Sequence, residues 1–267
     1  MRLAFVLAGA LASLPTRALA EDSVSCGAAN RGALANAAEL PLEGDGFVIP
    51  EPWRSRDMRF GTSELVGVIQ RAASAVSEAH PGAVLGVADM SRQAGGACPG
   101  HQSHQSGRDA DLLYYAVDAD GDPFAPDEHM PYYNRKGRAY YARKPVWARS
   151  IPERFFDVER NWALVKSLIT DADVELERIF VSPRIERWLV QHAKAVGEDE
   201  ELVHKARVLL HRPRDSEPHN DHMHVRIKCS AEDVAAGRCR TNFKRRKNGK
   251  WRSRVRCPRE PRQNTQS

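Results

Sequence analysis

Beyond its first twenty residues the sequence lacks any long apolar run. No later stretch approaches the ~18 consecutive apolar residues that a membrane-spanning helix needs, so we expect no membrane span. The chain also lacks an internal repeat, and no linker divides residues 21–239. Of 267 residues, 42% are apolar and 28% are charged, which is typical of a globular protein with a sizeable core. We therefore expect one globular domain over residues 21–239.

The one long apolar run lies in residues 1–20, which read MRLAFVLAGALASLPTRALA. A basic residue, Arg2, precedes apolar residues 3–14, and Ala-Leu-Ala at residues 18–20 precedes Glu21. This order of basic, apolar and small residues is typical of a secretory signal peptide. The alternative, a buried N-terminal helix, fits poorly with the acidic residues that follow. We therefore predict export, with the mature chain starting at Glu21.

Positive charge is scarce in the body of the chain and concentrated at its C-terminal end. The whole sequence carries a formal charge of +5, of which the predicted signal peptide holds +2. Residues 240–262 carry eleven Lys or Arg and one acid, Glu260, and so hold +10, which leaves −7 for residues 21–239. We predict a basic tail over residues 240–267, either a solvated arm or a contact for an anionic wall polymer. Interleaved aromatic residues are also found in nucleic-acid binders, but export argues against that partner.

The five cysteines include no C-x-x-C pair, so the spacing of a zinc ribbon is absent. In an oxidising compartment, disulfides are the expected use of cysteine. Cys229 and Cys239 would close a short loop. A bond between Cys26 and Cys257 would tie the N-terminal segment to the basic tail and leave Cys98 over. Five cysteines fix no connectivity, so both pairings are hypotheses and the role of Cys98 stays open.

Helix and strand signals alternate irregularly along the body of the chain. Apolar residues at helical spacing, each set behind a capping side chain, predict helices over 63–79, 157–171, 183–196 and 199–210. Short apolar or alternating runs predict strands over 84–88, 112–117, 178–182 and 222–228. Residues 21–60 lack periodicity, and residues 118–154 are predicted to form a long loop region. Because no β-α-β unit recurs, we predict an α+β fold with a mainly antiparallel central sheet and flanking helices.

Five of the ten histidines fall in two short stretches, residues 101–111 and 219–227, each against a predicted strand. Imidazoles and carboxylates in such places are the ligands of first-row metals. In a strand, His222 and His224 project from one face with Cα atoms about 7 Å apart. One of them can therefore bind a metal while the other reaches over its open position. A lone histidine is usually a hydrogen-bonded surface or core residue, but the two stretches together favour a metal centre.

The two stretches resemble those of the penicillin-insensitive murein endopeptidases. That family belongs to a wider zinc fold shared by lysostaphin-type peptidases, D-Ala-D-Ala peptidases and the hedgehog signalling domain. The resemblance rests on SHQSGRDADL at residues 103–112, RIFVSP at residues 178–183 and HMHVRIKC at residues 222–229. It spans most of the chain between the predicted signal peptide and the basic tail.

The resemblance implies a zinc site on the sheet, with zinc as the only cofactor and His104, Asp111 and His224 as ligands. It implies His222 as the base that takes a proton from the zinc-bound water. It also implies two histidines close to the metal, beside it or facing substrate: His101 and His219. Zinc lowers the pKa of bound water towards 7, and an imidazole can accept that proton at neutral pH.

One carboxylate, Asp221, leaves the identity of the base open. It lies three residues before His224, where other branches of the zinc fold place a catalytic acid. Strand alternation turns Asp221 away from the face of His224 and so favours His222 as the base. If the strand begins only at His222, however, Asp221 can still bend in.

We therefore predict a periplasmic zinc metallopeptidase that hydrolyses peptide cross-links in peptidoglycan. By resemblance, the bond joins D-alanine to the side-chain amine of a diamino acid, and the partners are the stem peptides of the wall. One alternative is a D-Ala-D-Ala carboxypeptidase, which in this fold more often carries a carboxylate base. Another is a non-catalytic zinc module that binds the wall or a partner protein. The preferred cross-link, the physiological metal and the oligomeric state are left open.

Overall fold

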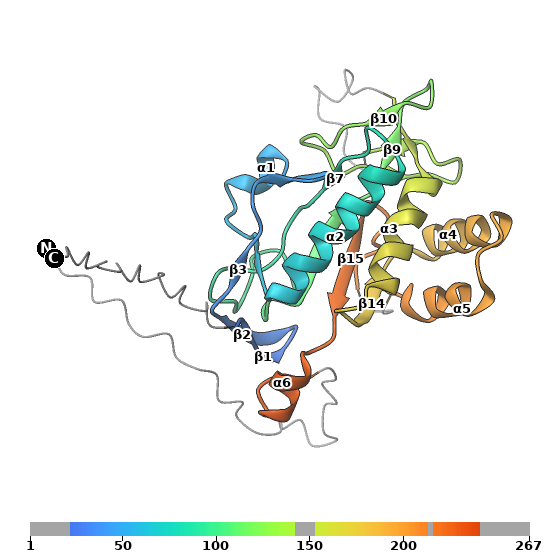
Figure 1. Cartoon of the computed structure of the whole chain (residues 1–267). Helices are drawn as coiled ribbons and strands as arrows, with labels where there is room; N and C mark the ends of the chain where they lie inside the picture. The colour runs from blue at the N-terminus through green and yellow to red at the C-terminus, as the bar shows by residue number, and fades with distance from the viewer. Residues whose placement is uncertain (1–21, 142–152, 213–215, 241–267) are drawn as a thin grey trace, which may run out of the picture.

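The structure is a computed structural model that describes residues 22–141, 153–212 and 216–240 (Figure 1). The predicted signal peptide, Cys257 and almost all of the predicted basic tail lie outside these residues. Within them, helices and short, mainly antiparallel strands form one domain, as the sequence predicted. No helix among the described residues is long and apolar enough to cross a membrane.

The central sheet has three antiparallel strands in the order β14 (Leu176–Phe180), β15 (His222–Ile227) and β8 (Asp109–Leu113). The middle strand, β15, pairs with β8 so that His224 lies directly opposite Asp111. On its other side, the same histidine lies opposite Phe180. Directly opposite residues on neighbouring strands project to the same face. The register therefore brings two of the predicted metal ligands together, although 113 positions separate them in the sequence.

Because side chains alternate along a strand, β15 divides the molecule into two sides. Three of its apolar side chains are buried in the main hydrophobic core: Met223, Val225 and Ile227. The side chains between them line a cleft on the opposite face: His222, His224 and Arg226. One strand thus fixes the sheet to the core with one face and supplies the candidate site with the other.

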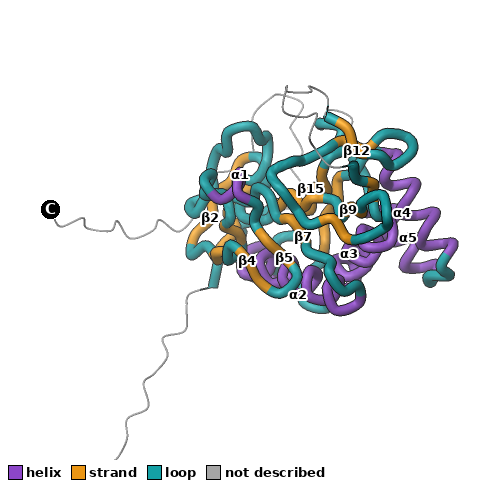
Figure 2. Tube along the Cα trace, turned by 90° about the horizontal axis from the view of Figure 1, so that it is seen from above, coloured by secondary structure: helices purple, strands orange, loops and turns teal. Residues whose placement is uncertain are grey.

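Four helices pack beside this sheet, namely α2 (Ser63–Ala79), α3 (Val158–Thr170), α4 (Pro183–Ala195) and α5 (Glu200–Leu209). Each begins behind a side chain that accepts a backbone N–H: Thr62, Asp157, Ser182 and Asp199. Such caps satisfy donors that have no partner inside the helix. The four predicted helices are confirmed to within two residues. Seen from above, they gather on one side of the molecule, with strands and loops on the other (Figure 2).

The predicted strands 178–182 and 222–228 correspond to β14 and β15 to within two residues, whereas the other two differ more from the structure. Residues 84–88 form only a short strand, β7 (Leu85–Gly86). The predicted strand 112–117 is divided, since β8 ends at Leu113 and a separate β9 spans Ala116–Val117. Between them, the backbone N–H of Tyr115 donates to the Asn161 side chain of α3 rather than to a neighbouring strand. The Asn161 side chain thus accepts a backbone N–H that a continuous strand would donate to a neighbouring strand.

The predicted loop region also contains short strands, which local sequence did not reveal. They are β10 (Pro123–Phe124), β11 (Tyr132–Tyr133), β12 (Ala139–Tyr140) and, after the residues that the structure leaves undescribed, β13 (Phe155–Phe156). β9 pairs with both β10 and β13, and β11 pairs with β12. Two residues per strand are too few for a periodic pattern, and the pairing of Phe155 with Val117 also joins segments that are far apart in the sequence.

The N-terminal segment, predicted to lack periodicity, forms a series of short elements around the core. They are β1 (Val24–Ala28), β2 (Arg31–Ala35), β3 (Ala38–Glu39), β4 (Glu43–Gly44), β5 (Phe47–Val48), α1 (Glu51–Arg54) and β6 (Phe60–Gly61). β5 pairs with β7 in parallel, the exception to the antiparallel pattern among the named strands. The turn of the β1–β2 hairpin, residues 28–30, lines the cleft that β15 faces.

The C-terminal segment of the described chain anchors this hairpin. After β15, the short helix α6 (Ala231–Ala235) carries Asp233, whose carboxylate accepts the backbone N–H of Ser25 at 2.8 Å. Gly27 exchanges two further backbone hydrogen bonds with Arg238 and Arg240. The predicted disulfide between Cys229 and Cys239 is confirmed and closes the loop that contains α6. The two ends of the described chain therefore hold one wall of the cleft in place together.

Candidate metal centre

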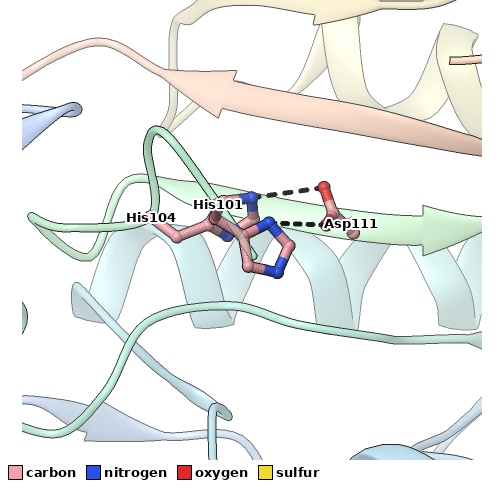
Figure 3. A group of neighbouring side chains, drawn as sticks. All are labelled: His101, His104 and Asp111. Atoms are coloured by element: carbon pink, nitrogen blue, oxygen red, sulfur yellow. Dashed lines mark ion pairs between the residues drawn. The ribbon is translucent and has the colours of Figure 1, made fainter. Parts of the chain in front are cut away.

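All five histidines of the two stretches line one cleft, together with Asp111, and the cleft contains about 470 Å³ of space for solvent. His101 and His104 lie on the loop before β8, Asp111 lies within β8, and the rings of the two loop histidines point towards its carboxylate (Figure 3). His104 has a backbone φ of 64°, in the left-handed region. Side-chain-bearing residues adopt this region at an energetic cost, which is often found at functional sites. The loop is thus held in a conformation that presents His104.

Two of the histidine rings are fixed by a hydrogen bond on the side away from the cleft centre. His104 Nδ1 lies 2.8 Å from the carbonyl oxygen of Met90, and His224 Nε2 lies 2.8 Å from Asp109 Oδ1. A carbonyl and a carboxylate only accept, so these two ring nitrogens carry the protons. The opposite nitrogens, His104 Nε2 and His224 Nδ1, are therefore left with lone pairs.

Two further rings follow the same rule, those of His101 and His222. His101 Nε2 donates to Asp89 Oδ2 at 2.8 Å, and His222 Nδ1 donates to Asp221 Oδ1 at 2.9 Å. Asp89 Oδ2 also lies 2.8 Å from Arg56 Nη2, so this carboxylate joins His101 to a second element of the chain. His101 Nδ1 and His222 Nε2 consequently also present lone pairs.

The four lone pairs converge on Asp111. Its Oδ1 lies 3.0 Å from His224 Nδ1, 3.3 Å from His104 Nε2 and 3.5 Å from His222 Nε2, and its Oδ2 lies 3.7 Å from His101 Nδ1. Asp111 Oδ1 is buried and accepts no hydrogen bond from the described residues. An acceptor oxygen surrounded by nitrogen lone pairs is repulsive, and a buried acceptor without a partner is costly. The arrangement is stable only with a cation, or with extra protons, between these atoms.

The spacing of the three closest ligand atoms suits a metal ion. His104 Nε2, Asp111 Oδ1 and His224 Nδ1 lie 3.3, 3.0 and 3.3 Å from one another. Ligands at ~2.0–2.1 Å from a tetrahedral zinc ion lie about 3.3 Å apart. A second grouping, which replaces His224 by His101, is looser, with its ligand atoms within 4.8 Å of one another. We favour the tighter set, because Asp89 holds His101 farther out.

Charges shift the pKa values of the groups around this centre. Burial alone would raise the pKa of Asp111, but His104 and His222 beside it hold that pKa well below its usual range. Burial alone would lower the pKa of His222, but the carboxylates of Asp111 and Asp221 outweigh burial and raise it to about 9. The cluster therefore attracts positive charge strongly.

The position of Asp221 decides how it can act. β15 begins at His222, so strand alternation does not fix the direction of Asp221. Its carboxylate accepts from His222 Nδ1 and lines a separate small cavity beside Tyr114 and Tyr133, rather than the cleft. Asp221 is therefore placed to orient His222 and to stabilise its protonated form.

His219 lies at the rim of the centre with its backbone in the left-handed region, at a φ of 49°. Its Nδ1 donates to the carbonyl oxygen of Glu217 at 2.6 Å, and its ring meets those of His222 and His224 at centroid distances of 5.1 and 5.7 Å. Burial and these two histidines lower the pKa of His219 to about 4. His219 is thus neutral and presents Nε2 as an acceptor.

Four further residues shape the site, and the sequence predicted none of them as a ligand or base, although it indicated Asp109 as a carboxylate behind the ligands or at the surface. Asp89 and Asp109 orient His101 and His224, the Phe180 ring stacks on His224 at 4.8 Å, and Arg226 lines the cleft. Phe180 and Arg226 lie within the RIFVSP and HMHVRIKC stretches, so their neighbours in sequence were a usable signal. Asp89 follows a predicted strand, but only the fold shows that it contacts His101.

Comparison with known proteins identifies the family. The sequence model for penicillin-insensitive murein endopeptidases matches residues 25–250. The chain belongs to this family. A relative from Klebsiella pneumoniae subsp. pneumoniae, named penicillin-insensitive murein endopeptidase, is 29% identical over 231 residues, 84% of this chain and 74% of the relative. A relative of the same name from Escherichia coli strain K12 / DH10B is 29% identical over 222 residues, 82% of this chain and 71% of the relative. The resemblance drawn from the three sequence stretches is confirmed.

Proposed function

We propose that this member of the murein endopeptidase family is a zinc-dependent peptidase that hydrolyses peptide cross-links in peptidoglycan. In this proposal His104, Asp111 and His224 hold the metal and His222 is the general base. The observation that carries the proposal is the buried Asp111 Oδ1, which accepts no hydrogen bond within the described part of the chain and faces ring nitrogens of three imidazoles. Membership of a peptidase family, together with the relatives' names, supports hydrolysis of murein peptides.

The residues that contact the proposed ligands from behind fix the orientation of their rings for metal binding. The Met90 carbonyl and the buried Asp109 carboxylate set the tautomers of His104 and His224. Partners of this kind orient a ligand and strengthen its basicity. Phe180 covers one side of the His224 ring and excludes water there. A bound divalent zinc ion supplies Lewis acidity, which polarises a carbonyl group and acidifies water.

His222 is suited to move a proton at its Nε2 atom. That nitrogen faces the cleft with its lone pair, and Asp221 stabilises the imidazolium that forms once it accepts a proton. In the absence of a cation, the pKa of about 9 would keep the ring protonated at neutral pH. With a divalent cation held beside Asp111, the pKa of His222 would fall, because positive charge nearby disfavours the imidazolium. His222 would then be neutral more often and able to accept a proton at Nε2.

The finer features of the proposal follow the family resemblance. The bond cleaved joins D-alanine to the side-chain amine of a diamino acid, and the partners are the stem peptides of the wall. His101 and His219 line the cleft beside the proposed ligands. In this proposal they lie beside the metal or face substrate. Export by the N-terminal signal peptide places the enzyme in the periplasm, where this substrate lies.

The test uses the mature chain, residues 21–267, and cross-linked muropeptide dimers. We expect release of monomers that a chelator abolishes and added zinc restores. Release of terminal D-alanine without monomers would instead establish the carboxypeptidase alternative. A protein that holds one zinc ion per chain and binds murein but releases neither product would be the non-catalytic wall-binding module.

A further inference from the structure

A second groove lies outside the cleft, and the proposed hydrolysis does not use it. Nine of the described residues line this groove, and it contains about 510 Å³ of space for solvent. Its apolar part is aromatic, because Trp188 of α4 and Phe156 of β13 meet there at a centroid distance of 5.3 Å. Both rings are half-buried against the main hydrophobic core, so each keeps an exposed part.

Two cations line the same groove without a counter-charge. Arg135 and Lys136 lie in the turn between β11 and β12 and are exposed. Neither side chain forms an ion pair within the described part of the chain, whereas the neighbouring Arg138 pairs with Glu153 at 2.7 Å. No Asp or Glu is among the described residues that line the groove, although residues 21–239 carry a net charge of −7. We call the groove around Trp188 and these two cations the basic groove.

The β11–β12 hairpin joins the basic groove to the cleft. At one end, the backbone N–H of Tyr133 donates to the carbonyl oxygen of Asn220, which follows His219 of the cleft. At the other end, the backbone N–H of Phe156 donates to the carbonyl oxygen of Gly137 in the turn. From Tyr133 to Gly137 the chain covers at most about 13 Å, at ~3.3 Å per residue. A ligand longer than this can therefore occupy the cleft and the basic groove together.

The hairpin also presents aromatic rings between the two sites. Tyr132 lies opposite Tyr140 across the two strands, with a centroid distance of 5.7 Å, and Tyr140 is 40% exposed. The charge of Asp221, burial and the charge of Glu217 raise the pKa of Tyr132, so its hydroxyl group lies within electrostatic reach of the edge of the cleft. The hairpin thus offers aromatic surface from the cleft edge towards the basic groove.

We propose that the basic groove binds a strand of the anionic wall polymer beside the cross-link that the cleft hydrolyses. This inference rests on the proposed function and adds a contact with the wall outside the catalytic cleft. The wall polymer combines sugar rings with peptides that carry carboxylates. The apolar faces of sugar rings pack against half-buried aromatic rings such as that of Trp188. The carboxylates pair with Arg135 and Lys136, which the protein itself leaves without an acid.

Other occupants fit the basic groove less well. A protein partner or a second copy of this chain typically uses about 20–30 residues on each side of an interface, whereas nine described residues line this groove. A small free anion would meet the two cations and leave the aromatic rings without a contact. A polymer with both sugar rings and carboxylates uses the whole groove.

The experiment measures co-sedimentation of the mature chain, residues 21–267, with intact murein in the presence of a chelator, which stops the proposed hydrolysis. We expect the double variant Arg135→Gln, Lys136→Gln to bind about 3- to 10-fold more weakly at low salt, the range of two exposed ion pairs. This difference should almost vanish in 1 M salt, where charges are screened within about 3 Å. The matched control Lys205→Gln, Arg207→Gln removes one lysine and one arginine from exposed positions of α5 outside the groove, and should bind like the wild type.

Two further measurements separate the parts of the groove. Trp188→Ala should weaken murein binding at both low and high salt, because packing against an aromatic ring is not screened, and denaturant unfolding shows whether this variant is folded. Soluble cross-linked peptides without sugar are too small to need the groove. The double variant Arg135→Gln, Lys136→Gln should therefore keep the wild-type kcat/KM on them, while its initial rate on intact murein falls by about 3- to 10-fold.

Equal murein binding by the wild type and Arg135→Gln, Lys136→Gln would overturn the inference. So would an equal loss in the α5 control, since net charge alone would then explain the binding. If the substitutions in the groove instead convert a dimer into a monomer in sedimentation velocity, the occupant is a second copy and the inference is wrong. If the wild type hydrolyses neither substrate, the proposed function fails separately, because co-sedimentation does not depend on hydrolysis and still decides the inference.

Discussion

The side chains on the two faces of β15 are satisfied in different ways. On the core face, Met223 and Val225 are fully buried among apolar side chains, and their packing needs nothing further. On the cleft face, His222 and His224 are held by carboxylates, yet among the described residues Asp111 Oδ1, which they face, accepts no hydrogen bond. The core face is satisfied by its own packing, whereas the cleft face needs a cation or extra protons between its side chains. Substitutions on the core face of β15 should therefore change the stability of the fold, and substitutions on its cleft face should change metal binding.

The largest effect is expected for His104→Ala, which removes a proposed ligand from the cleft face. The purified variant should contain almost no zinc, and its activity should fall by more than the ~10²–10⁴-fold that loss of a general base costs. Metal analysis and muropeptide hydrolysis measure both. His204→Ala, which removes an exposed histidine of α5, is the matched control. Full zinc occupancy in His104→Ala would remove His104 from the ligand set.

His222→Ala should separate chemistry from metal binding. We expect zinc content close to that of the wild type and a fall in kcat of about 10²–10⁴-fold, because the proton acceptor is lost while the ligands remain. Single-turnover hydrolysis with parallel metal analysis tests this. Unaltered kcat would contradict the assignment of the base, and loss of zinc would make His222 a ligand.

Met223→Ala, on the other face of the same strand, should affect stability alone. Removal of a fully buried methionine side chain typically costs about 2–5 kcal/mol in the free energy of unfolding. Denaturant unfolding of the metal-free protein measures that cost. The zinc affinity of the folded variant should match that of the wild type. A large fall in affinity would show that the two faces are coupled and would break the comparison.

Asp109→Asn should weaken the cleft face without removing a ligand. The amide accepts less strongly from His224 and leaves Arg226 without its counter-charge, so we expect zinc affinity to fall about 10- to 100-fold. Competition with a chelator of known affinity measures the change. An unchanged zinc affinity would mean that the Met90 carbonyl and the pairing of β15 with β8 are enough to orient the ligands.

The smallest effect is expected far from the cleft, at the pair of Asp171 and Arg71 that joins α3 to α2. The hydrogen bond from Arg71 lowers the pKa of Asp171, so the pair stabilises the fold above the unfolded pKa, about 3.9, and is lost as pH falls through the folded pKa. Arg71 is 45% exposed, so Asp171→Asn should cost less than about 1 kcal/mol at pH 7. The difference from the wild type should shrink in unfolding experiments below pH 4 and be independent of chelator. A chelator-dependent difference would contradict the contrast between the two regions.

The sequence predicted the helices more closely than the strands because helix signals are local. Thr62, Asp157 and Asp199 cap the helices that directly follow them, and apolar spacing defines the buried sides. The bounds of β8 instead depend on its pairing with β15, more than 100 residues away, so the strand begins at Asp109 and not at Leu112 as predicted. Pairing between distant segments leaves little trace in a local pattern.

The candidate site shows the same difference between what local sequence signals predict and what only the fold reveals. The spacing of histidines and carboxylates in the sequence predicted a metal centre, and the family resemblance implied which four side chains form it: His104, Asp111, His222 and His224. Neither revealed what fixes their tautomers, because the Met90 carbonyl belongs to the backbone and carries no residue signal. The proposed Cys26–Cys257 pair and the basic tail remain predictions, since Cys257 and residues 241–267 lie outside the described residues.

The attachment of the β1–β2 hairpin has a consequence for the order of folding. Ser25 is held by Asp233, 208 positions later, so one wall of the cleft cannot be fixed until almost the whole described chain has been made. The entropy cost of closing so long a loop is only a little larger than that of closing a short one. The contact between Ser25 and Asp233 nevertheless forms late, because Asp233 is made near the end of the described chain. A nascent chain can therefore assemble the helices and the histidine loop while the groove for substrate is still open on one side. The cleft is therefore completed last, when the two ends of the described domain meet.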